Sequence, residues 1–228
     1  MKSVLRRSNK SGMLSKLLLL TVMMLATSIN VLAEDGPRTT ENKAASNTKI
    51  LVIRALDNVK SNYYDHYLLA ENTGIAKDSV NQVYNEVVEQ NLQSSGTGLN
   101  FIGMDEHKLN TKLWTPIVEQ IQLKGDGENM RADLSSVNKT DLKRAMQNAG
   151  ASYLLVIDAQ YLRYSEQPMP MMYHFVNYTL YDSDEKQLTS GQNYFSAYQP
   201  QSKKALAKSS MKTVRKIADE VSKVIKHF

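Results

Sequence analysis

The sequence predicts an α/β protein of α+β-like character, in which helices pack on a mixed β-sheet. Two segments carry this prediction. Residues 140–157 read as an amphipathic helix, a glycine and an apolar strand, and residues 173–198 read as two strands joined by a polar turn. With the flanking segments, the expected order is strand, helix, strand, insertion, helix, three strands and a final helix.

The first 33 residues are expected to be a secretory signal peptide. A basic leader precedes the apolar run 17–32, and the small residue Ala33 stands at the expected cleavage site. A retained membrane anchor is the alternative, but the apolar run is shorter than the about 20 residues of a spanning helix. Residues 34–47 read as a flexible tether, and residues 48–228 as a single domain with an insertion at about 105–139.

Charge and cysteine content exclude several classes of protein. The chain has 28 basic and 23 acidic residues, and five of the basic ones lie in the leader, so the expected mature chain is neutral overall. A broad nucleic-acid-binding surface is therefore not expected. The chain has no cysteine, which excludes disulfides, thiolate chemistry and a lipid-modified cysteine. We expect an exported protein, periplasmic or secreted, that is soluble after cleavage.

The first part of the domain alternates strands with one helix. Residues 49–56 and 99–104 are expected to be strands, and residues 57–77 a long ordered loop. Ser79 and Gln82 match a capping box that opens a helix. The apolar side chains on one face of that helix are Val80, Val83, Tyr84 and Val87.

The insertion permits two interpretations. Apolar residues recur every fourth position at Leu109, Leu113, Ile117 and Ile121, and Thr115–Pro116 would suit a helix start, so a helical insertion is favoured. Residues 117–134 could equally form two strands around a Gly-Asp-Gly turn.

The next unit is a helix followed by a buried strand. Thr140 is the expected cap, and Gly150 is the expected left-handed stop. The strand 153–157 ends on Asp158. An acid at this place can be a general base or a metal ligand, but no histidine or second acid is near in sequence. We therefore expect Asp158 to mark the emergence of the strand into solvent, or to bond neighbouring backbone.

Two stretches of this region resemble a group of bacterial envelope domains. "LKRAMQNAGASYLLVIDAQY" (142–161) is similar to the group's helix, Gly-Ala-x-Tyr and strand element, and "YDSDEKQLTSG" (181–191) is similar to its hairpin turn. The group includes the curli secretion channel protein, the lipoprotein activator of penicillin-binding proteins and the amino-terminal domain of TolB. The resemblance implies an accessory or adaptor role without catalytic residues. This chain departs from the group in lacking a lipidated cysteine and a Pro-Phe ending of the first strand.

A methionine-rich segment provides the alternative function. "QPMPMMYHF" (167–175) contains four soft or borderline metal ligands: Met169, Met171, Met172 and His174. Thioethers in an oxidising compartment suit Cu(I). The other interpretation is a proline-stiffened loop whose methionines fill gaps over the core.

The closing helix, expected at about 201–228, has one apolar and one basic face. The apolar face consists of Leu206, Val214, Ile217, Val221, Val224 and Phe228. The helix carries eight basic residues against Asp219 and Glu220, an excess of six positive charges. The partner-binding candidates are Lys208, Lys212, Arg215 and Lys216. They form either a solvated face or a docking face for an acidic partner or an anionic membrane surface.

Together these patterns predict a non-enzymatic exported protein without a cofactor. It is expected to act as an accessory or adaptor in cell-envelope assembly or secretion, through binding to an envelope protein or through self-association. The alternative is a periplasmic small-molecule or Cu(I)-binding protein built on the segment from Met169 to His174. No serine-nucleophile elbow and no phosphate-binding glycine motif is present.

Overall fold

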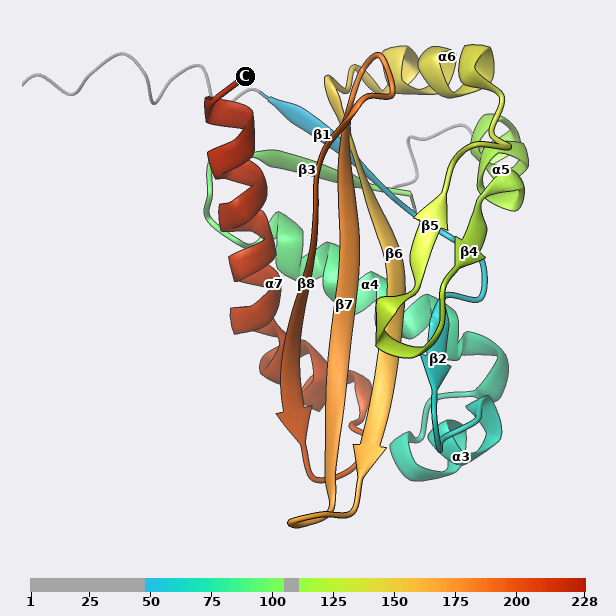
Figure 1. The fold of residues 1–228 in the computed structure, drawn as a ribbon, viewed down its shortest axis with the longest axis vertical. Coiled ribbons are helices and arrows are strands. Elements are labelled where there is room, and N and C mark those ends of the chain that lie inside the picture. The colour runs from blue at the N-terminus through green and yellow to red at the C-terminus, as the bar shows by residue number, and fades with distance from the viewer. Residues whose placement is uncertain (1–47, 105–110) are drawn as a thin grey trace, which may run out of the picture. The chain divides into compact units, whose positions relative to one another are not determined.

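The computed structural model describes residues 48–104 and 111–228, without the side chain of Thr111. The expected leader and tether, and Leu109 of the insertion, lie outside these residues. The described part forms a mixed β-sheet with helices on its faces (Figure 1), so the predicted α/β class is confirmed. No helix of this part is long and apolar enough to cross a membrane.

The central strand of the main sheet is β6, which has partners along both edges. The strands are β1 (Lys49–Arg54), β2 (Val59–Ser61), β3 (Asn100–Gly103), β6 (Tyr153–Ser165), β7 (Met171–Asp182) and β8 (Gln187–Ala197). Their order is β3-β1-β6-β7-β8. On one edge of β6, β1 pairs in parallel with the first part and β2 with a later part. On the other edge β7 pairs antiparallel, and β8 follows it as the predicted hairpin.

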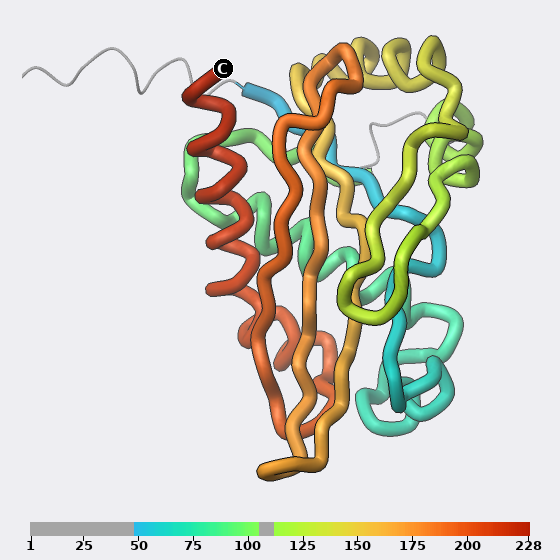
Figure 2. The backbone as a smooth tube through the Cα atoms, in the orientation of Figure 1, coloured from blue at the N-terminus to red at the C-terminus, as the bar shows by residue number. Residues whose placement is uncertain are grey.

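The two faces of the sheet are covered unequally. The helices are α3 (His66–Thr73), α4 (Val80–Gln93), α5 (Thr111–Gln120), α6 (Lys139–Ala149) and α7 (Lys203–Lys226), with short 3-10 helices η1 (Lys77–Ser79) and η2 (Gly127–Asn129). Helices α4 and α7 bury one face, and α5 and α6 bury the other only beside β1 and the start of β6. Along the rest of β6, β7 and β8 this second face carries no α-helix, and the tip of the β4–β5 hairpin with η2 packs on β6 and β7 instead (Figure 2).

The insertion contains both of the structures that the sequence allowed. Helix α5 is followed by a hairpin of β4 (Gln122–Lys124) and β5 (Arg131–Asp133), with η2 at its tip. Trp114 and Ile117 of α5 are buried against the sheet. Pro116 lies inside α5 rather than in its first turn, so the expected helix start at Thr115 is wrong.

Three local expectations are corrected by the structure. The expected loop 57–77 contains β2 and α3, and α3 is capped by Asp65, whose carboxylate accepts from the Leu68 amide at 2.8 Å. Ser79 is the last residue of η1 and makes no side-chain capping bond. Its backbone is already helical, whereas a capping residue is usually extended. Helix α6 is capped by Asn138 rather than by Thr140.

The helix stop and most of the closing helix are confirmed. Gly150 is left-handed, with φ of 63°, and its N–H bonds the end of α6. In α7 the predicted apolar stripe is buried from Leu206 to Val221, and Val224 is half-buried. Phe228 is 73% exposed, so its inclusion in the stripe is wrong: the helix ends at Lys226, before the side chain can reach the sheet.

Candidate functional site

Asp158 is fully buried, so the expectation that it emerges into solvent is wrong. Strand β6 continues to Ser165 with an irregularity between Ile157 and Ala159, and β5 of the insertion packs beside it. The carboxylate of Asp158 accepts from the Thr179 hydroxyl at 2.8 Å, and Nε of Arg131 lies 3.9 Å away. Burial raises the pKa of Asp158 to about 7, although the Thr179 hydroxyl, the Ala132 amide and Arg131 act to lower it. The surroundings fit a structural role.

The methionine segment is divided between two faces of β7. Met172 and His174 are buried on the side covered by the helices, whereas Met171 is half-buried and Met169 is 50% exposed in the β6–β7 loop. Successive side chains of a strand point to opposite faces, so Met171 and Met172 diverge. The ring of His174 stacks on Phe195, with centroids 4.5 Å apart, and burial lowers its pKa to about 3. The strand therefore does not bring the four candidate ligands together.

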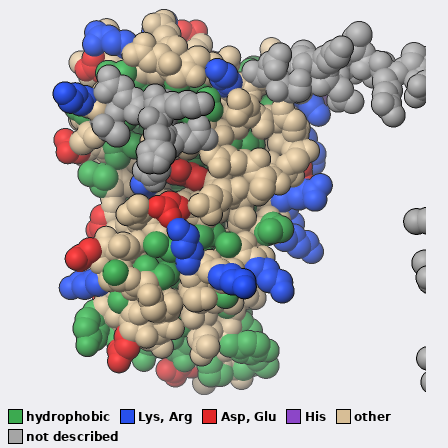
Figure 3. Space-filling model, turned by 180° about the vertical axis from the view of Figure 1, so that it is seen from behind, with side chains coloured by type: hydrophobic (Ala, Val, Ile, Leu, Met, Phe, Trp, Pro, Cys, Tyr) green, Lys and Arg blue, Asp and Glu red, His purple; other side chains and the backbone are tan. Residues whose placement is uncertain are grey.

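The basic candidates on α7 share one exposed surface. Lys208, Lys212, Arg215 and Lys216 are all exposed and form no ion pair with other described residues. Seen from behind, Lys and Arg side chains line the edge along which α7 runs (Figure 3). The exposure of these side chains agrees with the cationic face that helical periodicity predicts.

An aromatic layer lies beside the tip of the insertion hairpin, on the face of the sheet opposite α4 and α7. Tyr161, Phe175 and Tyr194 are cross-strand neighbours on β6, β7 and β8. In the next row Tyr173 lies beside Arg163, and the Tyr194 ring contacts both Tyr173 and Phe175, at centroid distances of 6.1 and 5.4 Å. Tyr194 is 58% exposed. These rings form a layer across three strands, in which Phe175 is buried, Tyr161 and Tyr173 are half-buried and Tyr194 is exposed.

Arg163 is held in place within this layer. Its guanidinium carbon lies 5.1 Å from the ring centroids of both Tyr173 and Phe175, which is within cation–π range. Its Nη1 donates to the Glu128 carboxylate at 2.8 Å. Glu128 belongs to η2, and its backbone carbonyl accepts a second hydrogen bond, from the Asn177 side-chain amide at 2.8 Å. The hairpin tip of the insertion thus docks on the sheet and neutralises the arginine.

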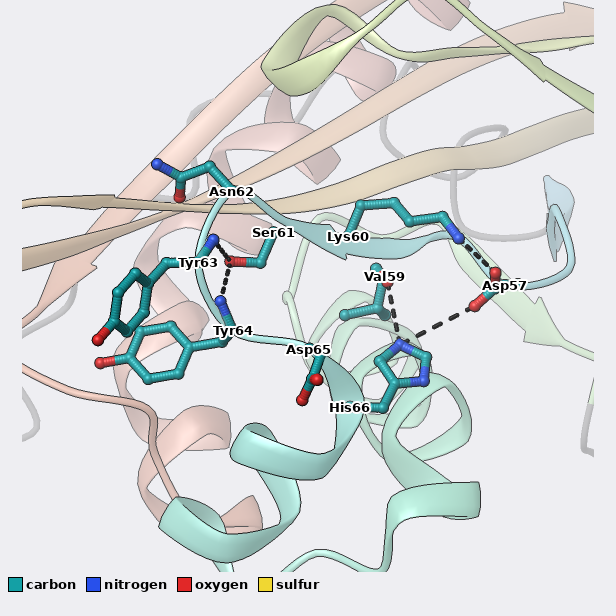
Figure 4. A pocket seen from close by; sticks show the side chains of 9 residues that line it. All are labelled: Asp57, Val59, Lys60, Ser61, Asn62, Tyr63, Tyr64, Asp65 and His66. Carbon is teal, nitrogen blue, oxygen red and sulfur yellow. Dashed lines mark hydrogen bonds and ion pairs between the residues drawn. The ribbon is translucent and has the colours of Figure 1, made fainter.

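A pocket of about 410 Å³ adjoins the same end of the sheet, lined by Asp57 and by residues 59–66. Figure 4 shows Tyr63 and Tyr64 together at one side of it, and His66 facing Asp57 at the other, 3.9 Å between Nε2 and Oδ1. The ring of Tyr63 lies 4.8 Å from that of Tyr164 on β6. Burial acts to raise the pKa of Asp57, but hydrogen bonds from Lys60 and Asn81 outweigh it and lower the pKa. Asp57 is therefore an ion-paired anion rather than a proton donor.

Several exposed hydrophobic side chains of the described part lie at this end, although Leu56, Met211 and Phe228 are exposed elsewhere. Those at this end are Tyr63, Tyr67, Met169, Tyr194 and Tyr198, each at least 50% exposed. We call these five residues the aromatic end. Hydrophobic side chains are seen at the bottom of Figure 3, where α3, the β6–β7 loop and the end of β8 lie in Figure 1. A second pocket, of about 610 Å³, is lined by Asn72, by residues 198–202 and by Ala205 of α7.

Sequence reasoning missed the aromatic end. It also missed the aromatic layer, because Tyr161, Phe175 and Tyr194 are far apart in the sequence and meet only when the register of their strands is known. Among residues 48–104 and 111–228, no group of three or more His, Asp or Glu side chains is placed to hold a metal ion.

Comparison with known proteins gives distant structural likenesses only. No protein-family model and no curated protein sequence matches the chain. The hypothetical protein CT253 from Chlamydia trachomatis is 9% identical with a TM-score of 0.44, over 79% of this chain and 99% of that one. Lipoprotein GNA1162 from Neisseria meningitidis is 15% identical with a TM-score of 0.37, over 75% of this chain and 99% of that one. The PelC dodecamer from Paraburkholderia phytofirmans is 9% identical with a TM-score of 0.36, over 75% and 86%. Such identities and scores assign the chain to no family.

Proposed function

We propose that this chain is an exported, non-enzymatic envelope protein that acts as an accessory or adaptor by binding another protein through its aromatic end. The observation that carries the proposal is the clustering of exposed tyrosines there, with Tyr198 72% and Tyr67 63% exposed. Export is supported by the basic and apolar pattern of the first 33 residues.

The side chains of the aromatic end are those that bind proteins well. Tyrosine and methionine are enriched at protein interfaces, where a tyrosine provides a large contact area at little cost in conformational entropy. A contiguous apolar patch on a soluble domain commonly marks such an interface. The other face of the same strands is already buried under α4 and α7, so a partner would reach the sheet on the opposite face, where Tyr194 is exposed.

The charges at this end indicate the chemistry of the partner. Arg163 is paired with Glu128, and Lys60 with Asp57, so the cations beside the aromatic layer and the first pocket are already neutralised. We therefore infer a folded partner that contributes apolar side chains, rather than an acidic peptide. The pockets beside Tyr63 and Tyr198 are the places where such side chains would insert.

Site-specific photo-cross-linking in the exporting cell tests this proposal. A photoreactive phenylalanine derivative is placed at Tyr198, and in a matched control at Ser190, which is exposed near the opposite end of β8. The expected result is an adduct with one identified exported protein at position 198 and none at position 190. No adduct at position 198, or equal adducts at both, would refute the docking site. An adduct only between copies of this chain would replace the adaptor role with self-association.

A further inference from the structure

Helix α7 presents cationic side chains from its first turn to its last, with a gap between Lys216 and Lys223. It has 24 residues, which corresponds to about 36 Å at 1.5 Å per residue. Its exposed basic side chains are Lys203, Lys204, Lys208, Lys212, Arg215, Lys216, Lys223 and Lys226. Only Lys203 is paired with a described acid, Glu86. The other seven positive charges face solvent without a described counter-charge.

The acidic residues of α7 do little to offset these charges. The carboxylate of Glu220 accepts from the Tyr178 hydroxyl and, at 3.1 Å, from the Asn193 amide, so it is directed towards the sheet. Asp219 is then the single acid among the exposed cations. Two large apolar side chains accompany them: Met211 is 54% exposed, and Phe228, just beyond the helix, is 73% exposed.

We propose that this face of α7 binds the surface of an anionic phospholipid bilayer. The cations are spread over the full length of the helix, and a bilayer surface attracts such an array without requiring acids at matching positions. A protein partner would need acidic groups in register with Lys204, Lys212 and Lys223. Basic helices with an exposed apolar side chain are typical of binding in the membrane interface, and Met211 and Phe228 can enter the headgroup layer.

Helix α7, with its cationic face, and the aromatic layer lie on different sides of the sheet. Helix α7 packs on the face formed by Leu155, Val176 and Tyr178, whereas Tyr161, Tyr173 and Tyr194 are on the opposite face. A partner bound at Tyr194 would leave α7 free to rest on lipid, whereas one that entered the second pocket would meet the first turn of α7, because Ala205 lines that pocket. The two interactions depend on different residues, so either can fail without the other.

Vesicle sedimentation tests the proposal. The protein is purified from exporting cells, and its amino terminus is determined for each variant so that all variants compared begin at the same residue. Vesicles of phosphatidylcholine alone are compared with vesicles containing phosphatidylglycerol. The wild type should bind only the anionic vesicles, and less as salt rises. The triple variant Lys208→Gln, Lys212→Gln, Lys216→Gln should bind on the order of a hundredfold more weakly, since each lysine near an anionic surface contributes about fivefold.

A matched variant removes three lysines elsewhere: Lys77→Gln, Lys139→Gln and Lys143→Gln, all exposed and outside α7. It should bind anionic vesicles within about threefold of wild type, because these charges lie off the proposed surface. Both variants should melt as the wild type does, because exposed charges contribute little to stability. Equal binding of wild type to neutral and anionic vesicles, or equal losses in the two triple variants, would overturn the proposal.

Discussion

Asn58 and Asn85 hold each other through two reciprocal amide hydrogen bonds, at 2.7 and 3.1 Å, and both side chains are buried. Asn58 lies between β1 and β2, and Asn85 lies on α4. Gln160 of β6 donates to the same oxygen of Asn85 at 3.1 Å. This network stabilises the turn by which the chain passes from β1 to β2. The turn lies beside the part of β6 where the register with β7 shifts, between Ile157 and Ala159.

Replacing Asn85 should therefore cost more than an ordinary polar substitution. Asn85→Ala leaves the amides of Asn58 and Gln160 without this buried partner, and we expect a loss of about 2–4 kcal/mol in the free energy of unfolding. Urea denaturation measures the loss. Gln90→Ala, an exposed position on the same helix, should change stability by less than about 0.5 kcal/mol. Similar values for the two variants would show that the network adds no stability.

Gly150 tests the helix-to-strand junction. Its φ of 63° is accessible to glycine but strained for a β-branched residue. Gly150→Val should lower the free energy of unfolding by about 1 kcal/mol or more, and Gly150→Asn by less, because asparagine tolerates the left-handed region. Thermal melts of the three proteins are the measurement. An unchanged melting temperature for the valine variant would contradict the junction.

Gly191 permits the close approach of a buried tyrosine. It is the cross-strand neighbour of Tyr178, and an added Cβ would lie 2.7 Å from Cε1 of that ring. Gly191→Ala should therefore destabilise the fold by about 1–3 kcal/mol. In a Tyr178→Ala background the same change should cost much less, and a double-mutant cycle measures this coupling. Additive losses would mean that the ring is not the obstacle.

Asp158 should make stability depend on pH. Its pKa is about 7 in the folded chain and near 3.8 when unfolded, so between these values only the unfolded chain releases the proton. Raising the pH from about 4 to about 7 therefore favours unfolding, by about 1.4 kcal/mol for each unit of pKa difference at most. Below pH 4 both states are protonated and the cost disappears.

The variant Asp158→Asn isolates this effect. It keeps the shape of the side chain and a hydrogen bond to Thr179 but has no proton to lose. Relative to the wild type, it should gain stability progressively as the pH rises from 4 to 7, as measured by urea denaturation at each pH. A constant difference between the two proteins across this range would show that Asp158 does not titrate with a raised pKa.

Much of the fold could be predicted because its signals are local. The apolar run before Asp158, the glycine at position 150 and the polar turn between β7 and β8 each determine structure over a few residues. The burial of Asp158 could not be predicted in this way. It depends on β5, which comes from a distant insertion and covers a strand that would otherwise emerge into solvent.

Strand β2 and the aromatic layer were missed for the same reason. Strand β2 has three residues and no apolar run, and its hydrogen-bonded partner is β6, about a hundred residues further along the chain. Tyr161, Phe175 and Tyr194 become neighbours only through the register of three strands. By contrast, the cationic face of α7 follows from helical periodicity alone, and the sequence was sufficient to locate it.

The affinity of the aromatic end for its partner tests the central claim most directly. The triple variant Tyr67→Ala, Tyr194→Ala, Tyr198→Ala is titrated against the purified protein that cross-links at position 198. The control is Leu56→Ala, because the Leu56 side chain is 58% exposed but does not belong to the aromatic end. The account predicts binding at least a hundredfold weaker for the triple variant, because exposed interface tyrosines are frequent hot spots, and an unchanged affinity for the control. A triple variant that folds and binds within threefold of the wild type would contradict it.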